Sequence, residues 1–151
     1  MFKRLIVSLC LGFSFFTVSV ARAETQNQQV KCLADNIYFE ARGEPLKGKV
    51  AVANVVMNRM KQPDRFGSTP CAVVKQKIAG HYQFSWMRHK SPIKYPDTYQ
   101  DCIHIAETVY NGHMQDVTNG STFYHAAYVH PKGWSKYRLT MKIEGHLFYK
   151  G

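Results

Sequence analysis

The chain has 151 residues, 45% of them hydrophobic and 20% charged, and its formal net charge at pH 7 is +10. This length suits one domain with one modest core, and the sequence contains neither internal repeats nor a linker long enough to divide it. The basic charge leaves three usual classes of anionic partner, which are nucleic acid, a membrane surface and an anionic polymer.

The N-terminus has the three parts of a secretory signal peptide. Residues 1–4 include two basic side chains, residues 5–20 are apolar, and Ala-Arg-Ala follows at 21–23. We therefore predict a signal peptide at 1–23 and a single exported domain at 24–151, periplasmic or extracellular and without stable membrane insertion after cleavage. A membrane anchor is the alternative, although the apolar run is short for one.

Without residues 1–23 the chain still carries a net charge of +7. Export argues against nucleic acid, so we favour an anionic polymer of the cell envelope, with a simple gain in solubility as the alternative. Cysteines at 32, 71 and 102 would remain in an oxidising compartment. One disulfide and one free thiol are expected, but the spacing does not say which two cysteines pair.

The first two predicted helices cover residues 30–41 and 45–60, separated by Arg42-Gly43 and a proline that is a good first helical residue. Glu40 then falls in the last turn of a buried helix. The helix dipole and the apolar neighbours both disfavour its charged form there. A carboxylic acid held protonated near neutral pH can donate a proton to a glycosidic oxygen.

The rest of the chain changes once from helix-like to strand-like composition. A short helix is expected at 70–76, an aromatic and basic segment with little periodicity at 79–96, and a fourth helix at 97–110. Strand-like composition follows at 121–126 and 140–149. The order of helices and then strands predicts an α+β domain with a small antiparallel sheet near the C-terminus.

Several blocks of the sequence together resemble the SleB/CwlJ family of cell-wall hydrolases. They are NIYFEARGE, KGKVAVANVVMNR, PCAVVKQ, QFSW and EGHLFY, in that order over residues 33–149. The resemblance implies a lysozyme-like fold, mostly helical, with the acid at the end of a helix between two parts. It also implies that Glu40 is catalytic and that Tyr124 and Trp134 lie near it.

The predicted activity is cleavage of peptidoglycan glycan strands at the MurNAc–GlcNAc bond, with Glu40 as acid and base and without a cofactor. Glu44 is the nearest rival or second acidic residue, although its position before Pro45 favours a cap of the second helix. A partner carboxylate, which most glycosidases need, is hard to find. A lytic transglycosylase needs none and is preferred; a hydrolytic muramidase or glucosaminidase, with the same acid, remains open.

Candidate substrate-binding residues combine aromatic rings with amides and hydroxyls, a mixture that suits sugars. For each of them a structural role is the alternative, and a non-catalytic peptidoglycan-binding module is the alternative for the whole chain. Histidines at 125, 130 and 146 could in principle bind zinc, but no compact ligand pair occurs, so no metal is expected. The candidates are Asn54, Gln83, Phe84, Ser85, Trp86, Tyr124, His125 and Trp134.

Overall fold

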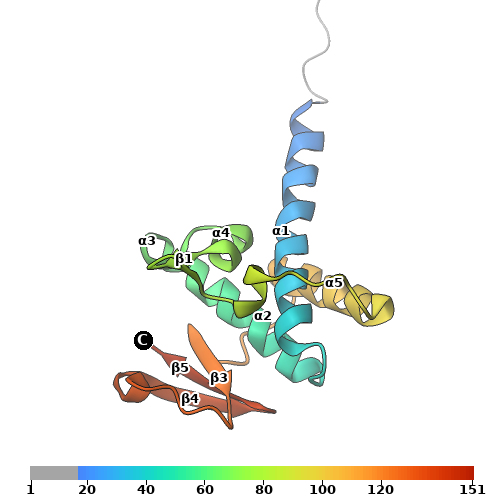
Figure 1. The fold of residues 1–151 in the computed structure, drawn as a ribbon. Coiled ribbons are helices and arrows are strands. Elements are labelled where there is room, and N and C mark those ends of the chain that lie inside the picture. Colours follow the sequence, from blue (N-terminus) through green and yellow to red (C-terminus); the bar gives the residue numbers. More distant parts are fainter. Residues whose placement is uncertain (1–16) are drawn as a thin grey trace, which may run out of the picture.

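The computed structural model describes the backbone of residues 17–151 and the side chains of residues 25–151 (Figure 1). Most of the predicted signal peptide, residues 1–16, lies outside the described residues, as do the side chains of the remainder. The signal peptide and its cleavage therefore stay predictions. Within the described part, no helix is long and apolar enough to cross a membrane.

The helical part is built around α1 (Thr17–Ala41), which packs against α5 (Pro96–Tyr110), α2 (Leu46–Met60) and α4 (Pro70–Lys75). A single helical turn, α3 (Pro63–Phe66), follows α2. The predicted start of the first helix at residue 30 is wrong, because α1 is already helical through the polar residues before it. Those residues contain neither glycine nor proline, so nothing local stops the helix.

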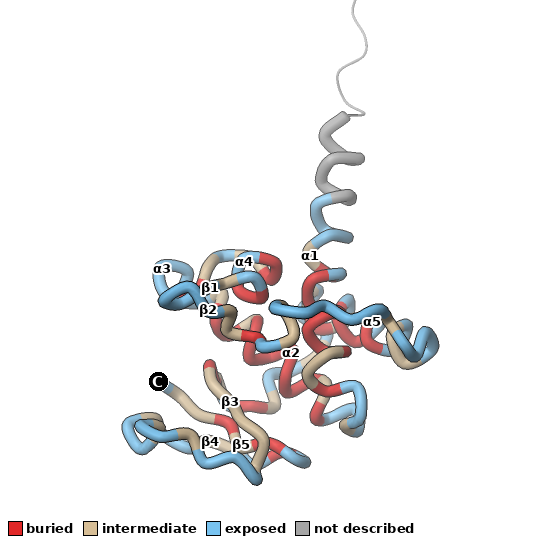
Figure 2. The backbone as a smooth tube through the Cα atoms, in the orientation of Figure 1, coloured by how far each residue is buried: buried red, intermediate tan, exposed pale blue. Residues whose placement is uncertain are grey.

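The main core lies where α1, α2, α4 and α5 meet (Figure 2). α2 is its centre, since ten of its residues are buried, including every residue from Val50 to Val56. Leu33 and Ile37 of α1 pack in the same cluster. α2 is thus the central buried helix of the helical part.

The segment between α4 and α5 is mostly irregular. It contains the two-residue strands β1 (Lys77–Ile78) and β2 (His81–Tyr82), which pair with each other, and the 3₁₀ turn η1 (Ser85–Arg88). It runs past the C-terminal half of α1 before α5 begins (Figure 1).

The C-terminal part is an antiparallel sheet in the order β3-β5-β4. Its strands are β3 (Phe123–Ala126), β4 (Arg138–Ile143) and β5 (His146–Lys150), and the 3₁₀ turn η2 (Trp134–Lys136) lies before β4. A second cluster, of Ala51, Val55, Ile143 and Phe148, joins one sheet face to α2. The α+β fold with a small C-terminal antiparallel sheet is confirmed.

One disulfide fastens the N-terminal helix to the helical part. Cys32 of α1 is bonded to Cys71 of α4, and Cys102 of α5 is a buried free thiol. The expected single disulfide with one thiol left over is confirmed, and its partners are now identified.

Candidate active site

Glu40 lies one residue before the end of α1, at the boundary between the helical part and the sheet. The chain leaves the helix directly after it: the amide of Arg42 still donates to Tyr38 O, and that of Glu44 to Ala41 O. The side chain of Glu40 is half-buried. The predicted place of this acid, in the last turn of a buried helix, is confirmed.

The sheet supplies the hydrogen bond of this acid. The hydroxyl of Tyr124, on β3, donates to Glu40 Oε2 at 3.0 Å. The ring of Tyr124 stacks on Phe148 at 5.6 Å, so the donor is held in place by the same cluster that joins the sheet to α2. Because Oε2 receives this bond, Oε1 is the oxygen that can carry a transferable proton.

The surroundings of Glu40 favour its protonated form. Burial raises the pKa of Glu40, while the Tyr124 hydrogen bond and the positive charge of Arg59 limit that rise. Burial and the neighbouring Glu40 carboxylate raise the pKa of Tyr124 well above its ordinary range, so Tyr124 stays a hydrogen-bond donor. The site therefore holds an acid that can lose its proton, next to groups that can stabilise the resulting charge.

Arg59 of α2 is buried beneath this site. Its Nε donates to Thr122 O at 2.7 Å, and its guanidinium lies 5.2 Å from the ring centre of Phe84 and 5.6 Å from that of Phe123. Burial lowers the pKa of Arg59, but an arginine keeps its proton at any physiological pH. Its Nη1 has no hydrogen-bond partner within the described part of the chain.

An aromatic wall lies beside Glu40 on the helical side. Trp86 stacks on Phe39 with ring centres 4.7 Å apart, and its Nε1 donates to Asn36 Oδ1 at 3.3 Å. Asn36 is one turn before Glu40 on the same face of α1. The structure thus brings Trp86 to the end of the helix that carries Glu40, where it stacks on the residue before Glu40.

The other residues of the QFSW block separate. Phe84 is buried in the main core against Arg59, and Ser85 is exposed at the start of η1. Gln83 is half-buried, with its amide bound to Gln76 O at 3.1 Å. Phe84 is therefore a core residue, while the 3₁₀ turn that begins at Ser85 carries Trp86 to α1.

Asn54 has a structural partner. It is buried on α2, where its Oδ1 accepts from the amide of Val117 at 3.1 Å. One turn later, Asn58 Nδ2 donates to Asp116 Oδ2 at 2.8 Å. Both amides hold the loop that leads into β3, so they fix the strand that carries Tyr124.

Glu44 has a different role from the one predicted. The expected helix cap is wrong, because the first turn of α2 has no side-chain cap hydrogen bond. Glu44 Oε2 instead accepts from the amide of Gly145 at 3.4 Å, and Oε1 lies 3.7 Å from His146 Nδ1. Since Gly145 forms the turn between β4 and β5, Glu44 links the start of α2 to the sheet.

The candidates near the C-terminus, Tyr124, His125 and Trp134, are split between the two faces of the sheet. Adjacent strand residues point to opposite faces, so Tyr124 faces the helices while His125 faces outward. His125 Nε2 is 3.0 Å from Tyr149 Oη, and its ring lies 5.1 Å from that of Trp134. These three rings line a hollow of about 270 Å³. Tyr124 reaches Glu40, whereas His125 and Trp134 do not contact it.

The histidines of the zinc alternative are also separated. His125 and His130 lie on the outer side of the sheet and His146 on the inner side. Across residues 25–151, no group of three or more histidine, cysteine or acidic side chains is placed to hold a metal ion.

Sequence reasoning missed Arg59, although the chain contains a signal for it. An arginine beside Asn58, in a helix that is apolar on most sides, must be buried with a partner. Neither the partner strand nor the distance to Glu40 can be read from that pattern, because both depend on how the sheet packs against α2.

Comparisons with known proteins agree with this arrangement. Residues 43–149 match the family described as Cell Wall Hydrolase. A spore cortex-lytic enzyme of Halalkalibacterium halodurans is 30% identical over 123 residues, which are 81% of this chain and 34% of that protein. The spore cortex-lytic enzyme of Bacillus subtilis is 40% identical over 53 residues, 35% of this chain and 17% of that enzyme. The chain thus spans about a third or less of these curated relatives.

Two solved structures share the fold. The catalytic domain of the germination-specific lytic transglycosylase SleB from Bacillus anthracis superposes with a TM-score of 0.61 at 28% identity, covering 83% of this chain and 95% of that one. The catalytic domain of the Bacillus cereus SleB protein gives 0.60 at 27% identity, covering 83% and 91%. The expected lysozyme-like fold is confirmed, and the match to residues 43–149 shows that the chain belongs to the cell wall hydrolase family.

Proposed function

We propose that this chain cleaves the glycan backbone of peptidoglycan at the MurNAc–GlcNAc bond, outside the cytoplasm, as a lytic transglycosylase with Glu40 as the acid and then the base. The observation that carries the proposal is the shielded carboxyl of Glu40, whose pKa is raised by burial and which Tyr124 orients. The lytic transglycosylase activity named for the Bacillus anthracis relative supports the reaction type.

The proposed reaction is a balanced intramolecular transfer. Glu40 donates its proton to the glycosidic oxygen as the bond from that oxygen to C1 of the muramyl sugar breaks. The 6-hydroxyl of the same sugar then bonds to C1 and closes a 1,6-anhydro ring. Its proton goes to Glu40, which is again ready to act as an acid, and no water is consumed.

Tyr124 and Arg59 fit the moment when Glu40 is charged. The carboxylate formed after proton donation keeps the hydrogen bond from the Tyr124 hydroxyl and the nearby guanidinium charge. Neither group moves or changes its own charge, so their stabilisation is available as soon as the proton leaves.

The neighbouring acids support a mechanism with a single carboxylate. Asp35 is bound to Lys90 at 2.6 Å and to the Tyr99 hydroxyl at 2.7 Å. Glu44 is engaged with the β4–β5 turn. Both are occupied in structural contacts, which favours the transglycosylase over a hydrolase that needs a second carboxylate.

Mass analysis of the products tests the reaction type. Purified sacculi are digested, and the released muropeptides are weighed. We expect 1,6-anhydro-muramyl ends, which weigh one water less than reducing ends. Reducing muramyl ends would instead indicate a hydrolytic muramidase, and reducing glucosaminyl ends a glucosaminidase.

A further inference from the structure

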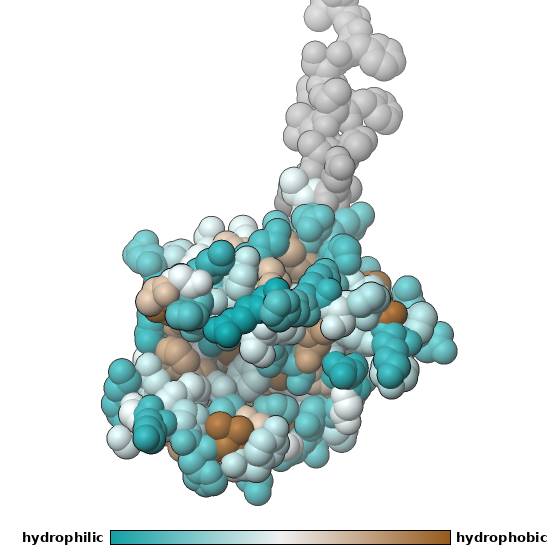
Figure 3. Space-filling model, in the orientation of Figure 1, coloured by the Kyte–Doolittle hydropathy of each residue, from teal (hydrophilic) through white to brown (hydrophobic). Residues whose placement is uncertain are grey.

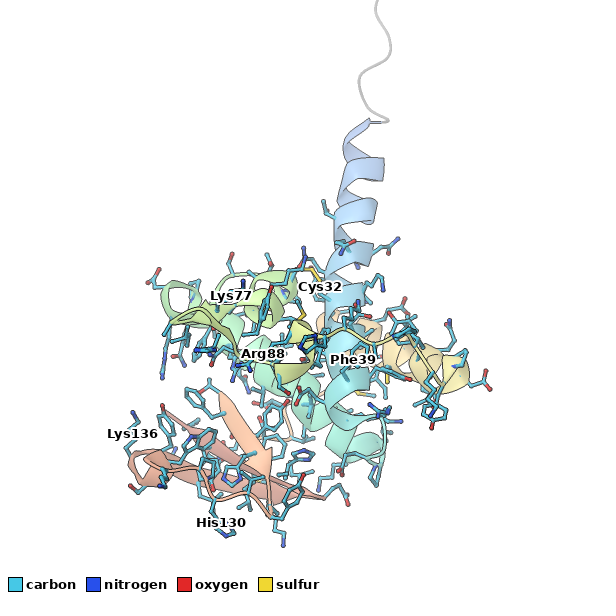
Figure 4. All side chains as sticks on the ribbon, viewed as in Figure 1. Cys32, Phe39, Lys77, Arg88, His130 and Lys136 are labelled. Atoms are coloured by element: carbon cyan, nitrogen blue, oxygen red, sulfur yellow. A yellow bond between two sulfur atoms is a disulfide. The ribbon has the colours of Figure 1, made fainter. Side chains whose placement is uncertain are left out.

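A hollow of about 440 Å³ lies beside the acid-bearing end of α1. It is lined by Tyr38 and Phe39 of α1 and by Ser91 and Pro92 of the segment before α5. Phe39 precedes Glu40 in the chain and stacks on Trp86, so the hollow continues from the aromatic wall of the candidate active site. Figure 4 shows Phe39 on this end of α1.

Two cationic side chains, Arg42 and Lys94, line this hollow. The guanidinium of Arg42 lies 5.5 Å from the ring centre of Tyr38, and Lys94 Nζ lies 5.7 Å from that of Tyr95. Within the described part of the chain, neither cation forms a salt bridge, and no acidic side chain lines the hollow. Both charges are therefore available to an anionic ligand.

The segment that supplies Ser91, Pro92 and Lys94 to the hollow is itself basic. Residues 85–96, from η1 to the start of α5, contain three lysines and arginines and no aspartate or glutamate. In Figure 3 a hydrophilic band crosses this face of the molecule at the level of the segment between η1 and α5. A wall of one charge sign raises the local concentration of ligands of the opposite sign.

The segment that carries Lys94 is held against α1 by buried contacts. The Tyr38 hydroxyl accepts from the amides of Lys94 at 3.0 Å and of Tyr95 at 3.1 Å. Lys90 Nζ lies 2.6 Å from Asp35 Oδ2, and Asp35 is buried. The hollow is thus formed before any ligand binds, which lowers the ordering cost of binding.

We propose that this hollow is a subsite for the acidic peptide stem of peptidoglycan, an inference that rests on the proposed function. The stem begins at the lactyl group of the muramyl sugar, the same sugar whose C1 reacts beside Glu40. Its carboxylates suit the planar fork of Arg42 and the ammonium of Lys94, and its alanine methyl groups suit the half-buried ring of Phe39 in the lining. The enzyme then acts best on glycan that still carries its stems.

The test compares two substrates and two double variants. The substrates are purified glycan strands with intact stems and the same strands after enzymatic removal of the stems. The variants are Arg42→Gln with Lys94→Gln, and a control of equal charge change, Lys47→Gln with Lys142→Gln, at exposed positions outside the hollow.

On intact strands we expect the Arg42/Lys94 variant to raise KM about tenfold with kcat within about twofold, whereas the control matches wild type. On stem-free strands all three proteins should behave alike. An equal loss on both substrates, or an unchanged KM on intact strands, would overturn the subsite.

A binding measurement separates this inference from the proposed function. In a Glu40→Gln background, which is designed not to turn over, a disaccharide tetrapeptide should bind more tightly than the bare disaccharide, and the Arg42/Lys94 substitutions should abolish the difference. Equal binding of the two ligands contradicts the subsite even if cleavage is confirmed. A clear preference supports it even if the products contradict the transglycosylase reaction.

Discussion

The proposed chemistry of this protein depends on the surroundings of one carboxyl group. Glu40 is half-buried, and this burial disfavours its charged form and raises its pKa, while Tyr124 and Arg59 limit that rise. An acid that is too weak cannot release its proton, and one that is too strong has already lost it at neutral pH. Burial and these two neighbouring groups therefore act in opposite directions on the pKa of Glu40.

The stability of a Glu40→Gln variant should reveal the shielding without any substrate. Since the pKa of Glu40 is raised in the folded state from its ordinary value of 4.5, the unfolded chain ionises first as the pH increases. The free energy of unfolding of wild type therefore decreases as the pH rises, until the pH has passed the pKa of Glu40 in the folded state. The Glu40→Gln variant has no charge at this position and does not show this decrease. Thermal unfolding should show Glu40→Gln more stable at about pH 8, and the gain should vanish by about pH 4.

A second prediction concerns the tyrosine on β3. Tyr124→Phe removes the hydrogen bond that stabilises the charged carboxylate, so the pKa of Glu40 should rise further. The alkaline limb of the pH–rate profile should then move to higher pH, and maximal turnover should fall about tenfold, the equivalent of one hydrogen bond of about 1.4 kcal/mol. A limb that stays in place or moves to lower pH would contradict this role.

At the scale of elements, α1 carries the acid and is fastened at several points. Its C-terminal end is placed by packing on α2 and α5, and its middle is joined to α4 by the Cys32–Cys71 disulfide. The sheet is fixed to α2 by Glu44 and by the second hydrophobic cluster, which contains Ala51 and Phe148. Glu40 and Tyr124 meet because both elements are anchored to the same central helix.

Removing the disulfide should destabilise the fold without touching the acid. The bond closes a loop with a sequence separation of 39, for which the chain-entropy relation gives roughly 3–4 kcal/mol. The Cys32→Ala, Cys71→Ala double variant should therefore unfold at a lower urea concentration, and its free energy of unfolding should be smaller by that amount. Reductant should lower the stability of wild type and of Cys102→Ala alike, because Cys102 is not part of the bond; a Cys102→Ala protein insensitive to reductant would contradict this.

At the scale of the whole molecule, the basic net charge, +10 for the full chain and +7 without residues 1–23, predicts an electrostatic component of wall binding. Exposed charges are screened over about 10 Å at 0.1 M salt and about 3 Å at 1 M. Co-sedimentation of the protein with purified sacculi should fall several-fold as the salt concentration rises between these values, while its fold, followed by circular dichroism, stays constant. Binding that is unaffected by salt would show that contact with the wall depends on uncharged groups.

Much of this molecule could be predicted from local patterns. The helix that ends beyond Glu40, the central apolar helix and the two strand regions all follow from hydrophobic period and from proline and glycine positions. The early start of α1 was missed because polar residues without breakers can equally form a helix or an extended lead-in.

The assembly of the site depends on tertiary packing, which periodicity does not contain. Tyr124 and His125 are neighbours in sequence, but the pleat of β3 sends only Tyr124 to Glu40. Trp86 approaches α1 through a 3₁₀ turn, and Arg59 through the sheet that covers α2. Candidate residues could therefore be named by type, but not sorted into those that meet Glu40 and those that support the fold.

The most direct measurement of the central claim is the release of soluble muropeptides from sacculi by Glu40→Gln. The matched control is Glu107→Gln, the same chemical change at an exposed glutamate of α5. Loss of a general acid is worth roughly 10²–10⁴-fold in rate. We expect Glu40→Gln to release at least about a hundredfold less while still binding the wall, and Glu107→Gln to match wild type. Release by Glu40→Gln at the wild-type rate would show that the proton comes from another group.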